Sequence, residues 1–407
     1  MMKSTTTTTC RLVPRIYLGT MTFGWAEQTS SLVDETVALN MVQRCFQFLA
    51  SQAVSEPPKE LSLSIDTARI YSKGISESYC GYIRNHIEAE AVVSNPTNVT
   101  TLHLSIGTKA HPTGHSLGLS PQGIQLQFQQ SCQSLQTRTL AEYYLHQPDV
   151  HHPLEDSLQY MHHLVQQGAV LRYGLCNYHA NEVQRAFDLC EAHGWTKPSL
   201  YQGLYNPLNR TAEQDLFPLL EQHHCSFIAY NPLAGGLLTG KYQYHTRTNT
   251  SHNNNNNNQE DTTIQPMVAT KGRFDNNPNY IPRFYTTDNF KAVQKIHQAC
   301  IQEGISIIEA TFRWLLLHSS LHSTAQGQHG VLLGASSVDQ LDENLQACAT
   351  VQPLSLHVLQ AMEEAWEWTR PQAFPYWRSY SSDMPHRDVL PQGASYSSSG
   401  GGGSKPL

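Results

Sequence analysis

The fold is decided by a stretch that follows a short apolar run: Asp66-Thr67-Ala68-Arg69-Ile70-Tyr71-Ser72-Lys73-Gly74-Ile75-Ser76-Glu77. Asp66 lies at the end of a predicted strand. Lys109 and His146 end two later apolar runs in the same way. In a barrel of parallel strands, the carboxyl ends of all strands meet on one face, where active sites are built. We therefore expect Asp66, Tyr71, Lys109 and His146 to meet on that face.

Short apolar runs alternate with helical patterns along the whole chain, which is typical of an α/β fold with a parallel sheet. The strand candidates are Ile16–Thr20, Leu63–Thr67, Leu104–Lys109, Glu142–His146, Tyr173–Asn177, Leu200–Tyr205, Phe227–Asn231 and Val331–Ala335. Between them lie amphipathic stretches such as Glu155–Gln167, whose apolar residues recur at helical spacing. Eight strand–helix units favour a closed (β/α)8 TIM barrel over an open sheet.

One barrel domain is expected to cover residues 13–378, and three polar segments fall outside its pattern. They are the N-terminus at 1–12, an insertion at 246–266 with six consecutive asparagines, and a Ser- and Gly-rich tail at 379–407. Such segments bury too little apolar surface to offset the entropy lost on ordering. We therefore expect all three to be disordered. The insertion follows the seventh strand, on the face where the four polar residues gather.

The composition excludes several classes of protein. A net charge of −7 with 26 basic residues does not indicate a broad nucleic-acid-binding surface. No apolar run is long enough to span a membrane. Nine cysteines, without a Cys-x-x-Cys pair, argue against a disulfide framework and for a reducing compartment, so we expect the cytoplasm. The first residues lack the apolar core of a secretory signal, and organelle import stays a minor alternative because acids are absent there.

The four polar residues suit the reduction of a carbonyl group, which needs a hydride on carbon and a proton on oxygen. A free tyrosine has a pKa of about 10 and is a poor acid at neutral pH. A nearby cation lowers that pKa, and Lys109 is the candidate, held charged and oriented by Asp66. Tyr71 would then be the general acid. His146 would hydrogen-bond the carbonyl oxygen and stabilise its developing negative charge.

Other interpretations of these residues stay open. Asp66 and Lys109 could form a structural ion pair, Tyr71 could be a loop aromatic and His146 a core histidine. A metal-dependent hydrolase on the same fold would need His-x-His at an early strand end and further ligands. The first strand ends in Gly19-Thr20-Met21-Thr22-Phe23-Gly24, which offers no ligands, so no metal site is expected.

The stretch from Asp66 to Glu77 resembles the signature of the aldo-keto reductases, Asp-Thr-Ala-x-x-Tyr-x-x-Gly-x-Ser-Glu, and meets it in full. Lys109 and His146 fall where the family has its lysine and histidine. The resemblance runs over residues 15–378. It implies a (β/α)8 barrel that binds a nicotinamide cofactor without a Rossmann domain, which agrees with the absence of Gly-x-Gly-x-x-Gly after any strand.

Later stretches resemble one branch of that family, the aflatoxin-aldehyde reductases. The most specific stretch is Ala229–Tyr242; the others are Tyr201–Asn206, Gly272–Phe274, Tyr280–Phe284 and Tyr376–Arg378. The branch implies NADPH-dependent reduction of small aldehydes, dialdehydes or semialdehydes to alcohols, in detoxification. It also suggests a homodimer.

The resemblance implies a cofactor site built from several strand ends. Asn177 and Gln202 look like clamps on the nicotinamide carboxamide, and Tyr230 like the aromatic ring that stacks on nicotinamide. Gly235 and Gly236 suit a pyrophosphate site because they let backbone N–H groups approach closely. The implied cofactor residues are Gly19, Thr20, Asp66, Cys176, Asn177, Gln202, Tyr230, Asn231, Pro232, Leu233, Gly235, Gly236, Leu237, Gly240, Lys241, Arg273, Ser336, Ser337, Gln340 and Asn344.

On the substrate side, the resemblance implies Met21, His146, Tyr280, Arg283 and Arg378. The two arginines would hold a carboxylate or another polar group, which the guanidinium fork suits. The alternative for both is an ordinary surface arginine.

Two positions depart from the family pattern. Cys176 stands where the family usually has serine, which weakens one hydrogen bond to the carboxamide. Gln340 stands where many relatives carry an arginine for the 2′-phosphate. NADPH is therefore expected in preference to NADH on the overall resemblance rather than on a dedicated cation.

A cofactor-sensing binding module is the alternative to an enzyme. Some relatives, such as the potassium-channel β-subunits, use the barrel in this way. Strong nucleotide binding with negligible turnover would favour this alternative. The complete set of four polar residues and the match over 229–242 favour the enzyme.

Overall fold

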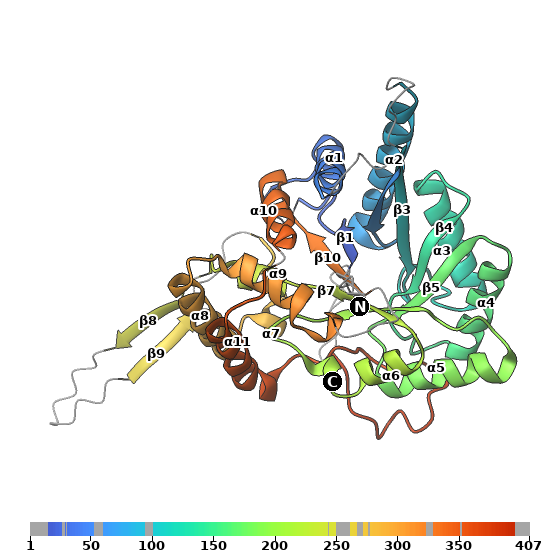
Figure 1. The fold of residues 1–407 in the computed structure, drawn as a ribbon. Coiled ribbons are helices and arrows are strands. Elements are labelled where there is room, and N and C mark those ends of the chain that lie inside the picture. Colours follow the sequence, from blue (N-terminus) through green and yellow to red (C-terminus); the bar gives the residue numbers. More distant parts are fainter. Residues whose placement is uncertain are drawn as a thin grey trace, which may run out of the picture.

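Eight parallel strands close into a barrel in the order β1-β10-β7-β6-β5-β4-β3-β2 (Figure 1). The computed structural model describes residues 15–26, 29, 31–52, 60–93, 101–242, 244–249, 261–266, 272–275, 277–322, 329–350 and 352–394. The barrel strands are β1 (Arg15–Gly19), β2 (Glu60–Asp66), β3 (Thr101–Ala110), β4 (Leu140–Leu145), β5 (Val170–Cys176), β6 (Leu200–Leu204), β7 (Ser226–Tyr230) and β10 (Gly330–Gly334). The predicted (β/α)8 barrel is confirmed.

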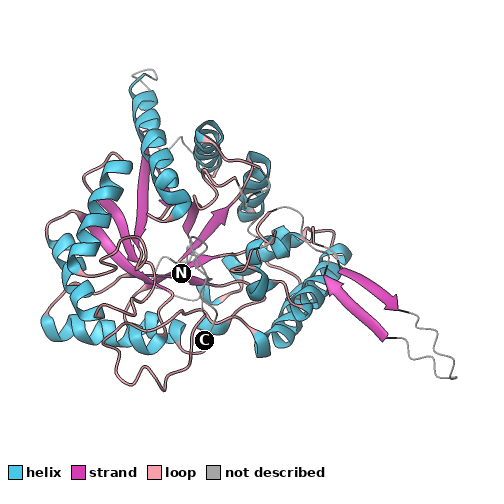
Figure 2. Ribbon diagram, turned by 180° about the vertical axis from the view of Figure 1, so that it is seen from behind, coloured by secondary structure: helices cyan, strands magenta, loops and turns pink. Residues whose placement is uncertain are grey.

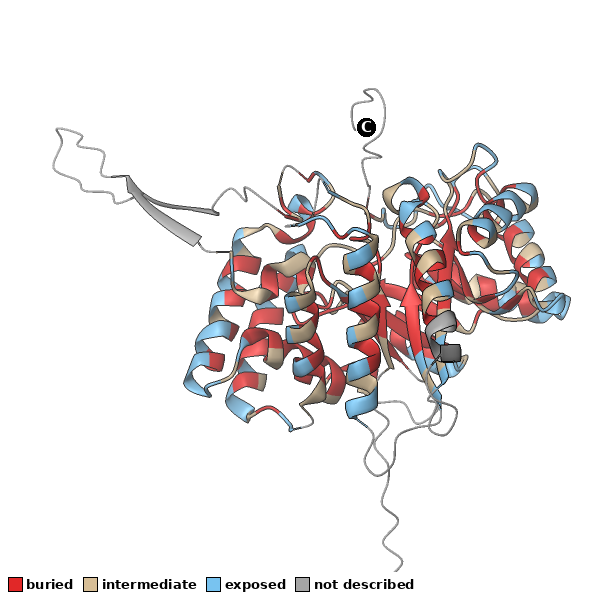
Figure 3. Cartoon of the chain, turned by 90° about the horizontal axis from the view of Figure 1, so that it is seen from above, coloured by how far each residue is buried: buried red, intermediate tan, exposed pale blue. Residues whose placement is uncertain are grey.

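Helices surround the barrel and bury one face against it (Figures 2 and 3). They are α1 (Glu35–Ser51), α2 (Ile75–Val93), α3 (Pro121–Ser134), α4 (Leu154–Gln166), α5 (Ala180–His193), α6 (Leu216–Gln222), α7 (Ile281–Phe284), α8 (Thr287–Gln302), α9 (Ile307–Leu317), α10 (Val338–Ala349) and α11 (Leu356–Thr369). Several begin at a Ser, Thr or Asp whose side chain accepts a backbone N–H from the first turn, as Asp34 does for α1 and Ser337 for α10. These caps fix where the helices start.

The register of β2, β3 and β4 places their carboxyl ends side by side. Asp66 pairs with Gly107, and Lys109 pairs with Tyr144. Backbone hydrogen bonds continue just past the strand ends: the His146 N–H donates to the Ala110 carbonyl at 2.8 Å. The polar residues that follow these strands are therefore held by the sheet itself rather than by free loops.

A buried carboxylate closes the barrel interior one layer below these strand ends. Glu142 Oε1 accepts from Tyr17 Oη at 2.9 Å and from Arg172 Nη2 at 2.6 Å. Glu142 Oε2 accepts from Tyr144 Oη at 2.5 Å. These hydrogen-bonded side chains belong to the packed core that fills the interior of such a barrel, while active sites are built above it at the carboxyl ends of the strands.

The flanks of the Asn-rich insertion form two paired strands, within the range 246–266 for which the sequence predicts disorder. β8 (Tyr244–Asn249) and β9 (Asp261–Pro266) pair antiparallel, from Tyr244 opposite Pro266 to Asn249 opposite Asp261. This two-stranded arm projects from the barrel (Figure 1). Threonines favour extended backbone, and each strand satisfies the main-chain groups of the other. Residues 250–260 of the insertion lie outside the described residues.

The sequence predicts disorder from residue 379 to 407, but the segment 379–394 packs against the barrel. The chain from 379 to 394 continues along the outside of the barrel, with Tyr380, Ser381 and Ala394 buried. Its polar groups find partners on α4 and α5, which composition alone does not reveal. The predicted disorder of 1–12 and of 395–407 concerns residues outside the described parts of the chain.

The burial of Glu182 on α5 makes stability depend on pH. Glu182 is fully buried, and its Oε1 accepts the Ser381 N–H at 2.8 Å. Burial raises the pKa of Glu182 to about 7, against about 4.3 for an unfolded chain. A carboxyl whose folded pKa is raised contributes stability that is full below the unfolded pKa and is lost as pH rises through the folded pKa.

We therefore expect the free energy of unfolding to fall by about 3 kcal/mol between about pH 4 and pH 8 relative to that of Glu182→Gln. Urea unfolding of both proteins across this range measures the difference. Glu221→Gln removes the same charge from an exposed position on α6 and serves as the control. Parallel pH profiles for the wild type and Glu182→Gln would contradict the argument.

Candidate active site

Lys109 and Asp66 form a buried ion pair at the carboxyl ends of β3 and β2. Lys109 Nζ donates to Asp66 Oδ1 at 2.8 Å, to Asp66 Oδ2 at 2.6 Å and to the Thr67 carbonyl at 2.7 Å. Gln202 Nε2 donates to Asp66 Oδ1 at 2.7 Å. Burial acts to lower the pKa of Lys109, but the Asp66 carboxylate raises it above its ordinary value. A fixed positive charge therefore lies under the rim of the barrel.

Tyr71 begins η1 (Tyr71–Gly74), just past β2, and lies over this charge. Lys109 Nζ is 5.2 Å from the centroid of the Tyr71 ring. The predicted direction of the pKa shift of Tyr71 is wrong: burial raises its pKa, and this effect exceeds the opposite effect of Lys109. The sequence predicts that Lys109 lies near Tyr71, but it does not report how completely folding excludes water from around Tyr71. Tyr71 thus keeps its proton at neutral pH.

His146 completes the group from the end of β4. Its ring packs edge-on to the Tyr71 ring, with centroids 5.9 Å apart. Burial lowers the pKa of His146 well below its usual range, and His111, Lys109 and Arg378 act in the same direction. The imidazole is therefore neutral and can donate one N–H while the other nitrogen accepts. The structure brings all four predicted polar residues together.

His111 is a neighbour of this group that sequence reasoning missed. Its ring lies edge-on to the His146 ring, with centroids 5.0 Å apart. The Thr113 N–H donates to His111 Nδ1 at 3.0 Å, which leaves the proton on Nε2 in the neutral ring. Burial lowers the pKa of His111 to about 4. The available signal was its position two residues after Lys109, at the same strand end.

Asn177 connects this group to the next strands. Its Nδ2 donates to the His146 carbonyl at 2.8 Å, and Tyr230 Oη donates to Asn177 Oδ1 at 2.7 Å. The Arg378 N–H donates to the Asn177 carbonyl at 2.9 Å. Asn177 and Gln202, which the sequence predicts as clamps on a ligand, donate hydrogen bonds to His146 and Asp66. Cys176 is buried beside Asn177.

A cavity of about 390 Å³ opens beside these residues, between the segments that follow β1, β7 and β10. Ten of the predicted cofactor residues line it: Asn231, Pro232, Leu233, Gly235, Gly236, Lys241, Arg273, Ser336, Gln340 and Asn344. The other lining residues, which were not named singly as cofactor residues, are Thr22, Thr29, Thr239, Tyr242, Gly272, Ile308, Phe312, Gly334, Ala335 and Glu343. Among them, Thr239 and Tyr242 belong to the stretch Ala229–Tyr242, and Gly272 belongs to Gly272–Phe274.

The other predicted cofactor residues lie outside the lining of this cavity. Gly19, Thr20, Asp66, Cys176, Asn177 and Tyr230 lie at or just past the ends of their strands, and Gln202 lies within β6. Leu237 is fully buried, Gly240 ends η3 (Ala234–Thr239), and Ser337 caps α10.

The cavity has the features of a phosphate-binding site. Gly235 and Gly236 have φ values of 68° and 99°, a left-handed backbone that favours glycine, and the Gly236 N–H donates to the Leu233 carbonyl at 2.8 Å. A Cβ at Gly235 would lie 3.0 Å from the Tyr280 ring. Asn231 Nδ2 and Arg273 Nη1 are buried and have no hydrogen-bond partner among the described residues. These donors, with the Lys241 and Arg273 cations, fit the phosphates of a nucleotide cofactor.

Arginines lie around Tyr280, whose ring also approaches Gly235 of the cavity. The guanidinium carbons of Arg273 and Arg283 are each 5.1 Å from the Tyr280 ring centroid. Burial lowers the pKa values of Arg283 and Arg378, but a delocalised guanidinium stays charged at neutral pH. Met21 Sδ accepts from Tyr280 Oη at 3.9 Å. The predicted substrate residues thus form a cluster next to His146 with a strong positive charge.

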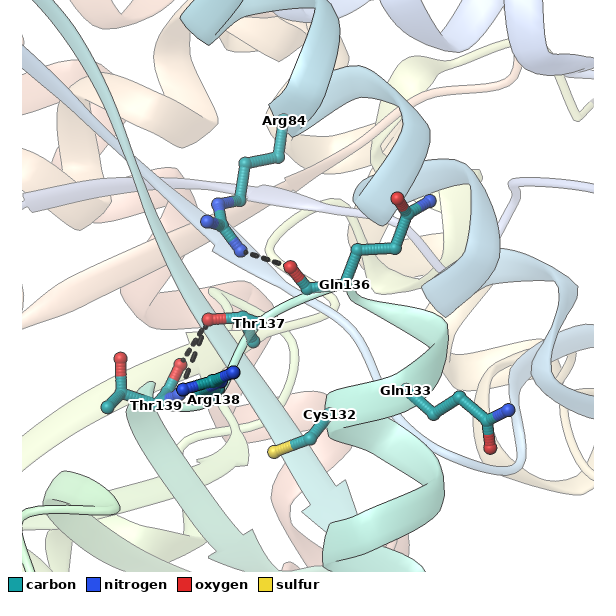
Figure 4. Close-up of a pocket in the computed structure, with 7 residues that line it drawn as sticks. All are labelled: Arg84, Cys132, Gln133, Gln136, Thr137, Arg138 and Thr139. Atoms are coloured by element: carbon teal, nitrogen blue, oxygen red, sulfur yellow. Dashed lines mark hydrogen bonds between the residues drawn. The ribbon is translucent and has the colours of Figure 1, made fainter.

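A second hollow is larger but lies far from this chemistry. Its volume is about 580 Å³, and its lining residues are Arg84, Cys132, Gln133, Gln136, Thr137, Arg138 and Thr139 (Figure 4). They belong to α2, the end of α3 and the segment before β4, so the hollow is at the amino-terminal end of the barrel. Active sites of this fold are built at the opposite end, so we assign the site to the smaller cavity.

Within the described ranges, no group of three or more His, Cys, Asp or Glu side chains is arranged to hold a metal ion. None of the described helices is long and apolar enough to cross a membrane.

The family model and the most similar proteins that were compared point to the same family. The model of the aldo/keto reductase family matches residues 15–367. Aldo-keto reductase family 7 member A3 of Homo sapiens is 37% identical over 312 residues, which cover 74% of this chain and 84% of that protein. Aflatoxin B1 aldehyde reductase member 2 of Homo sapiens is 36% identical, covering 74% of this chain and 77% of that protein.

A solved structure of an aldo/keto reductase from Klebsiella pneumoniae, in complex with NADP and acetate, has the same fold. Its TM-score is 0.54 at 19% sequence identity, and the match covers 87% of this chain and 92% of that chain.

Proposed function

Because this chain belongs to the aldo/keto reductase family, we propose that it reduces aldehydes to alcohols with NADPH and that Tyr71 donates the proton. The observation that carries this proposal is the buried Lys109–Asp66 pair, held at 2.6 Å beneath Tyr71 and next to a neutral His146. Relatives named as aflatoxin B1 aldehyde reductases support an aldehyde as the substrate. The chain is thus an oxidoreductase whose proposed substrates are small reactive aldehydes, dialdehydes and semialdehydes.

The described side chains can polarise a carbonyl and protonate its oxygen. His146 would donate an N–H to the oxygen, which orients the carbonyl and stabilises negative charge as it develops. Tyr71, which keeps its proton in the buried site, would then transfer it to the same oxygen. Burial makes the resulting phenolate costly, and Lys109 offsets part of that cost. Bound NADPH would supply the hydride to the carbonyl carbon.

The cofactor residues are proposed from the cavity. Asn231 would hold phosphates through its side-chain amide, Lys241 and Arg273 through their cations, and Gly235 and Gly236 would let the phosphates approach the main chain closely. Cys176, Asn177, Gln202 and Tyr230 would lie at the nicotinamide, and Ser336, Gln340 and Asn344 at the adenosine end. NADPH in preference to NADH, a cytoplasmic location and a homodimer belong to the same proposal.

The substrate side is proposed to favour aldehydes that carry a carboxylate. Arg283 and Arg378 place positive charge near Tyr230 and Tyr280 in a poorly hydrated site. A carboxylate there would form charge-assisted hydrogen bonds in a medium of low dielectric constant. An uncharged aldehyde would gain nothing from the two guanidinium groups.

The loss of reduced-nicotinamide absorbance against a panel of aldehydes tests this function. The panel pairs an aromatic aldehyde bearing an ortho-carboxylate with the same aldehyde lacking it, and adds a short carboxylate semialdehyde and a dialdehyde. We expect faster oxidation with NADPH than with NADH. We also expect kcat/KM to be about tenfold or more higher for the carboxylate aldehydes, because a hydrogen bond to a charged group contributes about 1.5–3 kcal/mol. Tight NADPH binding without turnover of any aldehyde would instead indicate a binding module.

A further inference from the structure

The residues from 379 to 394, here called the strap, run from Arg378 along α5 and α4 and back. The strap is the red-brown loop that hangs below α5 and α6 in Figure 1. The Ala394 N–H donates to the Trp377 carbonyl at 2.9 Å, so the strap closes on itself around Arg378. The Arg378 N–H is also bound to the Asn177 carbonyl. The main chain of Arg378 is thus fixed at the rim of the proposed site.

Asp383 anchors the middle of the strap to the start of α4. The cap residue of α4, Pro153, provides no side-chain hydrogen bond. Asp383 Oδ1 accepts the Leu154 N–H at 2.7 Å, and Oδ2 accepts from Arg185 Nη2 at 2.6 Å. Burial acts to raise the pKa of Asp383, but these hydrogen bonds lower it below its usual range. The carboxylate therefore supplies the cap that α4 lacks, where a negative charge is most favourable.

The strap is also tied to the segment that follows His146. The Ser382 N–H donates to the Asp149 carbonyl at 3.0 Å, and Arg387 Nη1 donates to the Val150 carbonyl at 3.1 Å. The Ser381 N–H donates to Glu182 on α5 at 2.8 Å. The strap therefore joins the segments after β4 and β5, which carry His146 and Asn177.

The far end of the strap rests directly on Arg378. A Cβ placed at Gly393 would overlap the carbonyl oxygen of Arg378, so only glycine permits this approach. Gly393 thus contacts Arg378 directly, Asp383 fixes the middle of the strap, and neither residue lines the cavity.

We propose that the strap fixes Arg378 for recognition of a substrate carboxylate, with Asp383 and Gly393 as positioning residues. This inference rests on the proposed function of Arg378. An arginine whose main chain is held in place loses less conformational entropy when its guanidinium binds an anion, so it binds more tightly than an arginine on a mobile segment. A loosened strap should weaken the binding of carboxylate aldehydes and leave the proton donor and the cofactor site as they are.

Steady-state kinetics of Asp383→Asn test the proposal, because this change keeps the shape and removes the charge. We expect KM for the ortho-carboxylate aldehyde to rise about tenfold and kcat to stay near that of the wild type. KM for the uncharged aldehyde should also be unchanged. Asp388→Asn removes an equal charge from an exposed position of the strap and should behave as the wild type. Gly393→Ala, which acts at the other anchor, should reproduce the selective rise in KM.

A double variant shows whether the strap acts through Arg378. Arg378→Met alone should raise KM for the carboxylate aldehyde, and adding Asp383→Asn should raise it no further. Equal changes in KM for both aldehydes, or additive effects in the double variant, would overturn the proposal. If the wild type is active and both Asp383→Asn and Gly393→Ala keep its preference for carboxylate aldehydes, the proposed role of the strap is refuted and the proposed function stands. A wild type without aldehyde turnover would refute the proposed function and the strap with it.

Discussion

Replacing Tyr71 with phenylalanine is expected to lower turnover about 10³-fold and to leave NADPH affinity within about twofold of the wild type. The ring that packs against His146 remains in this variant, so the site keeps its shape. Only the hydroxyl is lost, and with it the group that donates the proton. The rates of NADPH oxidation and the quenching of protein fluorescence by NADPH measure the two quantities separately.

Tyr160→Phe is the matched control, because it removes a hydroxyl from α4 on the outside of the barrel. It should keep full turnover. Since burial holds the pKa of Tyr71 above its ordinary value, the wild-type reduction rate should be flat from about pH 6 to about pH 9. Full activity of Tyr71→Phe would show that another group donates the proton.

Replacing Lys109 with methionine is expected to abolish turnover and to destabilise the fold by about 3–5 kcal/mol. The side chain is fully buried, and its ammonium makes three hydrogen bonds. Without it, the Asp66 carboxylate would be buried with no cation, and the phenolate of Tyr71 would lose the charge that stabilises it. Urea unfolding and NADPH oxidation measure the two effects.

A second substitution separates these effects. Asp66→Asn combined with Lys109→Met removes the uncompensated charge and retains an oxygen that can accept from Gln202. This double variant should recover much of the lost stability and none of the turnover. If Lys109→Met alone were as stable as the wild type, the ion pair would not contribute to the stability of the fold. If Lys109→Met kept its turnover, Tyr71 would not need a cation to donate its proton.

The barrel and the meeting of the four polar residues could be predicted because both depend on local pattern. Each strand is a short apolar run, and the rule that parallel strands end on one face brings Asp66, Lys109 and His146 together. The direction of the pKa shift of Tyr71 could not be predicted, because it depends on how completely folding excludes water from the site. No pattern in the sequence reports that quantity.

The strap and the arm were missed for a different reason. Both are polar in composition, and composition predicts disorder for them. The partners that order the strap are remote in sequence: Asp383 accepts from Leu154, 229 residues earlier, and Ser381 donates to Glu182, 199 residues earlier. In the arm, each strand is the partner of the other. Such pairings follow from the tertiary fold rather than from local periodicity.

The arm has a consequence for engineering. The chain leaves the barrel at Tyr242 and resumes at Gly272, and both residues line the cavity. A Cβ at Gly272 would lie 3.5 Å from Tyr242 Oη, so the two ends are neighbours. The entropy of closing a loop grows only slowly with its length. A change in the length of the arm should therefore add little closure entropy, and the arm is the place in the chain where a change of length can be made next to the cavity.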